Sequence, residues 1–152
     1  MQRFFHFLEI YSPAVLRIGM AAVILWFSMA QFSNANQWTI YVPDSVVSMT
    51  GLSVVTLVYL NAIFELVFGA LLLFGWQTRF VAFFLVAHLF DIMYVVGYGE
   101  IGVRDFGLAV ATLAVFMNGA DALCLKQKNS AREIEKITIM PQSPNQYPPK
   151  IY

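Results

Sequence analysis

The chain contains four long apolar blocks, and their length is the feature that most restricts how it can fold. The blocks cover residues 14 to 33, 52 to 76, 80 to 97 and 105 to 124. Each block is close to the roughly 20 residues that a helix needs to cross about 30 Å of hydrocarbon. Hydrophobic residues form 59% of the sequence and charged residues only 12%, an excess that lipid has to cover. Because backbone in lipid must satisfy its own hydrogen bonds, the sequence predicts an all-α, four-helix transmembrane bundle.

The segments that flank the blocks have a different composition. Residues 1 to 13 combine scattered charges with aromatic neighbours, which predicts a short interfacial helix, and Pro13 stands where a membrane helix can start. Residues 125 to 152 begin with mixed charges that favour an amphipathic surface helix and end in a proline-rich stretch typical of a flexible tail. The membrane domain is therefore expected to cover residues 14 to 124.

Positive charges lie mostly on one side of the predicted spans. Arg3 and Arg79 fall on the same side as the basic residues of the C-terminal segment, whereas Arg104 stands alone on the other side. Because short loops rich in Lys and Arg stay in the cytoplasm, both termini are expected to be cytoplasmic. The alternative is a cleaved signal peptide with its apolar core at residues 18 to 30, which would leave three spans.

Charge and cysteine content exclude several classes of function. Nine basic residues balance nine acidic residues, so no basic surface indicates nucleic-acid binding. Cys124 is the only cysteine and His6 and His88 are the only histidines, so the sequence offers no ligand set for a metal site or a haem. No tightly bound cofactor is expected.

Polar residues within the apolar blocks mark the candidate functional site, since a charge in hydrocarbon is costly unless it is paired or hydrated. Glu65 and His88 are predicted at the same depth near the bilayer centre, and Asp91 lies on the same helix face as His88. Together with Arg104 they predict a polar track from the centre to the outer mouth, along which protons can pass. The alternative is that these residues only hold the helices together.

Two further predictions concern residues elsewhere in the blocks. Arg17 and Asp121 lie at similar depth near the inner end, which predicts a structural ion pair; a functional role and snorkelling of Arg17 are the alternatives. Trp26 lies near the middle of its block instead of at an interface. It is therefore a candidate wall of a ring-binding pocket, with ordinary packing as the alternative.

Several motifs in the blocks are similar to those of a known family. They are the Arg17-Ile18-Gly19 start, Glu65 with Gly69 and Gly75, the Thr78-Arg79 turn, and Ile101-Gly102-Val103-Arg104-Asp105. On these motifs the chain resembles the DoxX family of small four-helix membrane proteins of bacteria and archaea, over most of residues 15 to 121. The stretch from Ser28 to Gln31 departs from the family, whose members often carry a Gly and a Lys there.

The resemblance implies a place among proteins whose namesake is linked to a thiosulfate:quinone oxidoreductase. It favours an accessory subunit of a quinone-linked redox or oxidative-stress complex in the bacterial cytoplasmic (inner) membrane, with a redox enzyme or a second copy of the chain as partner. The polar track would then form the polar side of a quinone pocket, with Trp26 or Tyr94 against the ring. Two other functions stay open, namely a small-solute or proton permease and a non-catalytic scaffold that recruits a cytoplasmic partner.

Overall fold

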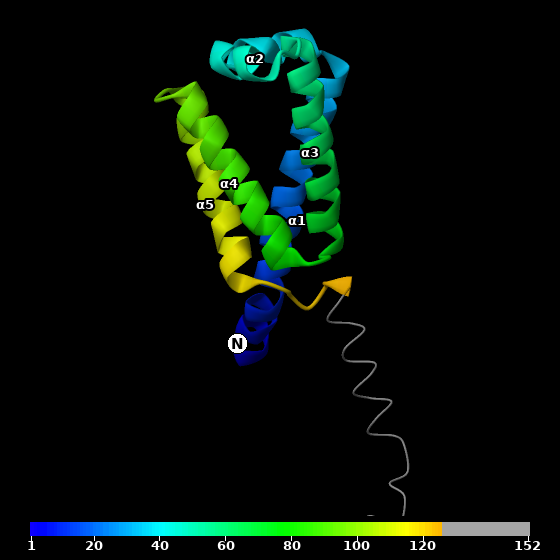
Figure 1. Cartoon of the computed structure of the whole chain (residues 1–152). Helices are drawn as coiled ribbons and strands as arrows, with labels where there is room; N and C mark the ends of the chain where they lie inside the picture. The colour runs from blue at the N-terminus through cyan, green and yellow to red at the C-terminus, as the bar shows by residue number, and fades with distance from the viewer. Residues whose placement is uncertain (126–152) are drawn as a thin grey trace, which may run out of the picture.

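The computed structural model describes residues 1–125, which consist of helices and the segments that connect them (Figure 1). In chain order the elements are α1 (Gln2–Ser33), the 3-10 helix η1 (Ala35–Tyr41), α2 (Asp44–Thr50), α3 (Val54–Phe74), α4 (Thr78–Val96) and α5 (Glu100–Asn118). No strand occurs in this part of the chain, so the predicted all-α class is confirmed. From residue 126 onward, the predicted C-terminal segment lies outside the described residues.

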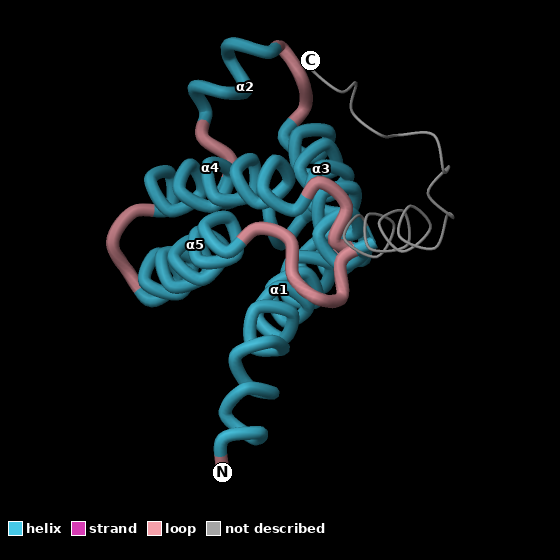
Figure 2. The backbone as a smooth tube through the Cα atoms, turned by 90° about the horizontal axis from the view of Figure 1, so that it is seen from below, coloured by secondary structure: helices cyan, strands magenta, loops and turns pink. Residues whose placement is uncertain are grey.

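The four long helices associate as two pairs. α1 packs along α3 and α4 packs along α5, whereas the contact between the two pairs is much less extensive. Figure 1 shows the pairs close together where α3 turns into α4 and further apart at the end that carries α2. Figure 2, seen from below, also places α4 directly beside α5. This arrangement positions the candidate site, because a cavity lies between the pairs on the side of α2.

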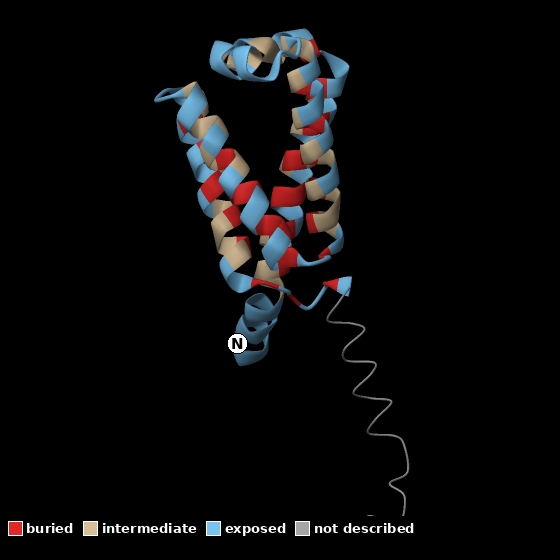
Figure 3. Cartoon of the chain, viewed as in Figure 1, coloured by how far each residue is buried: buried red, intermediate tan, exposed pale blue. Residues whose placement is uncertain are grey.

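Small residues allow the helices to approach each other closely. One alanine on each long helix is fully buried at 0% exposure: Ala21, Ala62, Ala82 and Ala109. A Cβ atom on Gly69 of α3 would lie only 3.1 Å from the side chain of Leu25 on α1, so glycine fits this crossing best. Figure 3 shows that buried residues face the neighbouring helices and that exposed residues cover the outside.

Local signals fix both ends of α3 and therefore the position of Glu65 on it. At the start, the Ser53 side chain accepts a hydrogen bond from the backbone N–H of Thr56. At the end, Gly75 has a φ of 68°, in the left-handed region that glycine enters without steric cost. A Cβ atom on Gly75 would also lie 2.6 Å from Sγ of Cys124. The tight turn into α4 therefore requires glycine both for its backbone conformation and for lack of space.

Three helices within residues 1–125 are long and apolar enough to cross a membrane, by length and composition: α1, α3 and α4. Large apolar side chains such as Val67 and Phe83 are exposed on their outer faces, as contact with lipid requires. α5 is not one of the three, and it carries Glu100, Arg104 and Asp105 in its first two turns. The chain is therefore a helical membrane protein by these criteria, and the fourth span stays a prediction.

The N-terminal segment differs from its prediction. α1 runs without a break from Gln2 through Pro13, so a membrane helix does not begin at Pro13 and residues 1 to 13 do not form a separate helix. Proline removes only the hydrogen bond to the carbonyl of Glu9, four residues earlier. Glu9 is exposed, so its carbonyl can bind water or headgroups instead, and the helix continues.

The last long helix also differs from its predicted range of residues 105 to 124. α5 begins at Glu100 and ends at Asn118. Arg104, which precedes the predicted block, therefore lies within this helix, and Gly119, with a φ of 75°, ends the helix. Asp121 therefore lies in the connection that follows α5, and not within a helix.

Candidate ligand-binding cavity

A cavity of about 450 Å³ lies between the two helix pairs. All four long helices contribute to its wall, and η1, α2 and the residues between them add a group of mostly apolar side chains: Trp38, Tyr41, Val42, Pro43 and Val46. The volume is within the range of roughly 300–1,000 Å³ that is typical of small-molecule sites. The cavity is therefore large enough for a ring-sized ligand.

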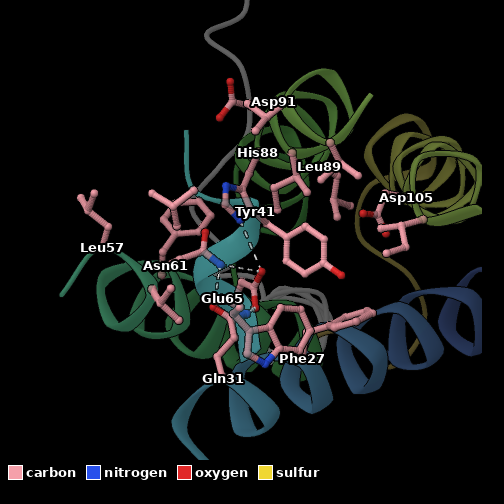
Figure 4. Close-up of a pocket in the computed structure, with 18 of the residues that line it drawn as sticks. Phe27, Gln31, Tyr41, Leu57, Asn61, Glu65, His88, Leu89, Asp91 and Asp105 are labelled. Carbon is pink, nitrogen blue, oxygen red and sulfur yellow. Dashed lines mark hydrogen bonds and ion pairs between the residues drawn. The ribbon is translucent and has the colours of Figure 1, made fainter. Parts of the chain in front are cut away.

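Four polar side chains meet at one wall of the cavity (Figure 4). Nε2 of Gln31 on α1 donates to Oε2 of Glu65 on α3 over 2.6 Å. Nδ2 of Asn61, one turn before Glu65, donates to Oε1 of Gln31 over 2.9 Å and to Oε1 of Glu65 over 3.1 Å. Nε2 of His88 on α4 lies 3.5 Å from Oε1 of Glu65. We refer to Gln31, Asn61, Glu65 and His88 as the polar cluster.

Helix geometry explains why three members of the polar cluster converge. Asn61 and Glu65 are four residues apart and so share one face of α3. The hydroxyl of Ser28 donates to the carbonyl oxygen of Ala62 over 2.8 Å, which fixes α1 against α3 at this level. Gln31 follows Ser28 by three residues and meets the same face of α3. The pair of α1 and α3 thus orients the carboxylate and both amides by itself.

His88 reaches the polar cluster from the opposite helix pair. Its side chain packs against the ring of Phe64 with 4.7 Å between the ring centroids. Nε2 of His88 is buried and has no hydrogen-bond partner within residues 1–125. An unpaired buried nitrogen is unfavourable, so this atom would gain from a hydrogen bond to a ligand.

Aromatic rings form much of the remaining wall, at Phe27, Trp38, Tyr41 and Phe64. Phe27 meets Trp38 edge to face at 5.9 Å, and the guanidinium of Arg104 lies over the Phe27 ring at 4.8 Å. Nε of Arg104 also donates to Oδ1 of the buried Asp105 over 2.7 Å. Apolar flat surfaces with a few fixed polar groups suit a planar ring that carries polar substituents.

No group of three or more His, Cys, Asp or Glu side chains suited to a metal ion occurs among the described residues. The polar cluster instead combines one carboxylate and one imidazole with two amides. Amides both donate and accept hydrogen bonds, so this wall presents hydrogen-bonding groups of both kinds.

The structure brings together part of the predicted polar track. Glu65 and His88 face each other, and Arg104 lines the same cavity but pairs with Asp105. Asp91 lies at the rim, is exposed, and turns its carboxylate away from Glu65 in Figure 4. Contacts among the described residues therefore do not connect Glu65 to Arg104 through Asp91.

The two aromatic residues predicted as ring contacts lie outside the cavity. Trp26 is 63% exposed and Tyr94 is 85% exposed, and neither lines the cavity wall. Both side chains point to the outer surface of the bundle, where lipid is the expected neighbour. The aromatic rings of the cavity wall come instead from residues such as Phe27 and Trp38.

Residues that the sequence prediction left out complete the site. Asn61 had a usable signal, because it precedes Glu65 by four residues on an otherwise apolar helix. Gln31 had a weaker signal, as one polar residue near the end of the first apolar block. Trp38 had none, because it belongs to a connection whose path depends on tertiary packing.

A second buried polar contact lies away from the cavity. Nε of Arg17 donates to Oδ2 of Asp121 over 2.6 Å, and the two side chains are 1% and 2% exposed. Nη1 of Arg17 also donates to the carbonyl oxygen of Leu72 over 2.7 Å. Burial alone raises the pKa of the Asp121 carboxyl, but hydrogen bonds from Arg17 and from the N–H of Leu123, with the Arg17 charge, lower this pKa below its ordinary value. The pair joins α1, the end of α3 and the segment after α5.

The long apolar helices and the cavity together define a helical membrane protein with an internal, polar-walled cavity. Residues 12–98, more than half of the chain, match the DoxX family, and the chain belongs to this family. The match includes the whole polar cluster and ends before α5. No curated protein and no solved structure matches the chain.

Proposed function

We propose that this DoxX protein binds the headgroup of a quinone in the cavity and serves as an accessory subunit of a quinone-linked redox or oxidative-stress complex. α5 is the fourth membrane span in this proposal, so that α1, α3, α4 and α5 surround the headgroup within the bilayer. The membrane is the bacterial inner membrane, and the basic residues around the spans favour cytoplasmic termini.

The observation that carries the proposal is the presence of the polar cluster and the aromatic walls in one cavity of about 450 Å³. A quinone headgroup is a flat ring with hydrogen-bonding oxygens, and a lipid-soluble ligand of this kind reaches a site inside a helical bundle from the bilayer. Nε2 of His88 accepts or donates no hydrogen bond within the described part of the chain, so it supplies a position for a ligand. Glu65 and His88 are also groups that can bind and release a proton.

An accessory role follows from what the cavity supplies. It offers binding and proton-handling groups, so the electrons would pass between the quinone and the cofactor of a partner. A redox enzyme in the same membrane is the proposed partner, with a second copy of the chain as the other option. Purification from native membranes followed by mass spectrometry would identify which of them stays attached.

The intrinsic tryptophans allow a direct test of ring binding. Trp38 lines the cavity, whereas Trp26 and Trp76 are 63% and 52% exposed and lie outside it. A protein with Trp26→Phe and Trp76→Phe therefore reports on the cavity through Trp38 alone. We expect a short-chain ubiquinone or menaquinone analogue to quench this fluorescence to saturation and to raise the melting temperature of the protein in detergent.

A matched pair of substitutions separates cavity binding from partition into the micelle. Ile92→Phe fills the cavity, because Ile92 lines it, and should weaken quenching at least tenfold. Ile63→Phe adds the same volume on the exposed outer face of α3 and should leave the affinity unchanged. Equal quenching of both variants, without a change in melting temperature, would refute quinone binding in the cavity.

A further inference from the structure

The polar cluster offers more hydrogen-bond acceptors than donors to a ligand. Both amide hydrogens of Asn61 are already used, one by Gln31 and one by Glu65. One amide hydrogen of Gln31 is used by Glu65. The Glu65 carboxylate has about four lone-pair positions, of which these two amides occupy only two. A ligand with O–H or N–H groups, which can donate hydrogen bonds, therefore matches this wall better than a ligand that can only accept hydrogen bonds.

We propose that the cavity binds the reduced, hydroxyl-bearing form of its ring ligand, a quinol, in preference to the oxidised form, a quinone. This preference rests on the proposed function, and it specifies which redox form the same site stabilises. A quinone oxygen can only accept hydrogen bonds, whereas a quinol hydroxyl donates one and accepts others. The two forms have nearly the same size and shape, so the cavity must distinguish them by hydrogen bonding.

The spacing of Glu65 and His88 fits one hydroxyl group. Nε2 of His88 and Oε1 of Glu65 are 3.5 Å apart, so a single oxygen can lie within about 2.7–3.0 Å of both. That hydroxyl donates to the carboxylate, and a hydrogen bond to an ionised group is roughly twice as strong as a neutral one. The same hydroxyl accepts a hydrogen bond from Nε2 of His88, which has no hydrogen-bond partner within residues 1–125. A quinone carbonyl in this place could accept from Nε2 of His88 as well, but it would set its oxygen against the Glu65 carboxylate without a hydrogen between the two oxygens.

Arg104 is a charged donor in the rest of the wall, where Trp38 and Tyr41 also carry donor groups. Its Nε donates to Asp105, which Figure 4 shows well apart from the polar cluster, and its guanidinium carbon lies over the Phe27 ring at 4.8 Å. A second quinol hydroxyl can accept a hydrogen bond from this guanidinium, as a quinone carbonyl also can. The quinol therefore satisfies both the donor and the acceptor sides of the cavity, while the quinone satisfies only the donor side.

The charges around the cavity select against anionic ligands. The Arg104 guanidinium is paired with the Asp105 carboxylate, which leaves the Glu65 carboxylate in the polar cluster and the exposed Asp91 carboxylate at the rim. An inorganic oxyanion or a fatty-acid carboxylate would meet net repulsion here, whereas a neutral quinol would not. A neutral ligand that donates hydrogen bonds is thus the class that both the charge and the hydrogen-bonding pattern favour.

The test compares menadiol with menadione as matched probes of the two redox forms. Binding to the full chain in detergent is measured by equilibrium dialysis without oxygen, with protein-free micelles as the partition reference. We expect the dissociation constant of menadiol to be at least tenfold lower than that of menadione. For a two-electron couple, a tenfold preference raises the midpoint potential of the bound couple by about 30 mV.

Substitutions of two glutamates assign the preference to the polar cluster. Glu65→Gln replaces an acceptor oxygen with an N–H donor and should abolish or reverse the preference. Glu100→Gln makes the same change at an exposed position on α5 outside the cavity and should retain it. Glu65→Asp keeps the carboxylate, should retain the preference for menadiol, and serves as the second variant if Glu65→Gln does not fold.

The outcomes distinguish this inference from the function on which it rests. Equal dissociation constants for the two probes, or a lower one for menadione, would overturn the preference and leave ring binding intact. The same preference in Glu65→Gln as in the parent would also overturn it. Binding of neither probe above the micelle reference would instead overturn quinone binding in the cavity.

Discussion

The buried pair of Arg17 and Asp121 permits a quantitative test of how the bundle is held together. The side chains are 1% and 2% exposed, so either one alone would be left as a buried charge without a partner. Removing one member of such a pair typically costs about 3–5 kcal/mol. We therefore expect Arg17→Leu and Asp121→Leu each to lower the free energy of unfolding by about 3–5 kcal/mol.

The double variant is the informative comparison. Arg17→Leu combined with Asp121→Leu leaves no unpaired charge, and apolar replacement of a whole buried pair is often nearly neutral. The hydrogen bonds from Arg17 to the carbonyls of Leu72 and Leu73, and the one from the N–H of Leu123 to Asp121, remain lost. A hydrogen bond that involves a charged group corresponds to about 1.5–3 kcal/mol. The double variant should consequently be more stable than the sum of the single losses predicts, by several kcal/mol.

Reversible unfolding in mixed micelles, followed by helical circular dichroism, measures these free energies. Arg3→Leu is the matched control, because Arg3 is exposed on the same helix, and it should change stability by less than about 0.5 kcal/mol. Strictly additive losses in the double variant, or single losses below about 1 kcal/mol, would refute the view that a desolvated ion pair joins these segments.

Three further predictions follow from particular contacts. Because the pKa of Asp121 is lowered, its pairing with Arg17 stabilises the fold fully above the ordinary carboxyl pKa of about 3.9. This stabilisation is lost as the pH falls through the lowered pKa. Measured against pH, the melting temperature should therefore fall below about pH 4, and Asp121→Asn should lack this fall. Gly102→Ala should lower the free energy of thermal unfolding by about 1–3 kcal/mol, because the new Cβ atom would lie 2.0 Å from the backbone oxygen of Gly97. Gly107→Ala on the same helix is the control: its Cβ atom meets nothing within 4 Å, so this change should be neutral or stabilising. Asp91→Asn should change the affinity for a quinone analogue less than threefold in dialysis, since the Asp91 carboxylate is exposed and turned away from Glu65; a larger loss would restore the predicted track.

Depth along a helix could be read from the sequence, and it predicted which side chains lie at the same level. Counting residues from the block ends placed Glu65 level with His88 and Arg17 level with Asp121, and both pairs of side chains meet in the structure. The length of the apolar blocks likewise indicated where helices form, because a backbone in lipid must satisfy its own hydrogen bonds. Depth along a helix and the length of an apolar block both depend only on the spacing of residues in the sequence.

Rotation about the helix axis was not readable, and it accounts for the residues that were misplaced. Consecutive residues on a helix differ by about 100°, so Trp26 and Phe27 have nearly the same depth but opposite surroundings. Trp26 faces outward, while Phe27 lines the cavity below Arg104. An apolar helix has little amphipathic pattern to reveal this rotation, since lipid and protein interior favour the same side chains. Trp38 depends on the fold of η1, which the apolar blocks do not encode.

The claim that a ring ligand occupies the cavity is tested most directly by photolabelling. An azido-quinone analogue is irradiated with the purified protein, and the labelled residues are located by mass spectrometry, with and without excess unlabelled analogue. We predict label on cavity residues such as Trp38, Tyr41 and Ile92 that the competitor removes. Label that falls instead on outward residues such as Trp26 and Phe83, and that the competitor does not reduce, would contradict the proposed binding site.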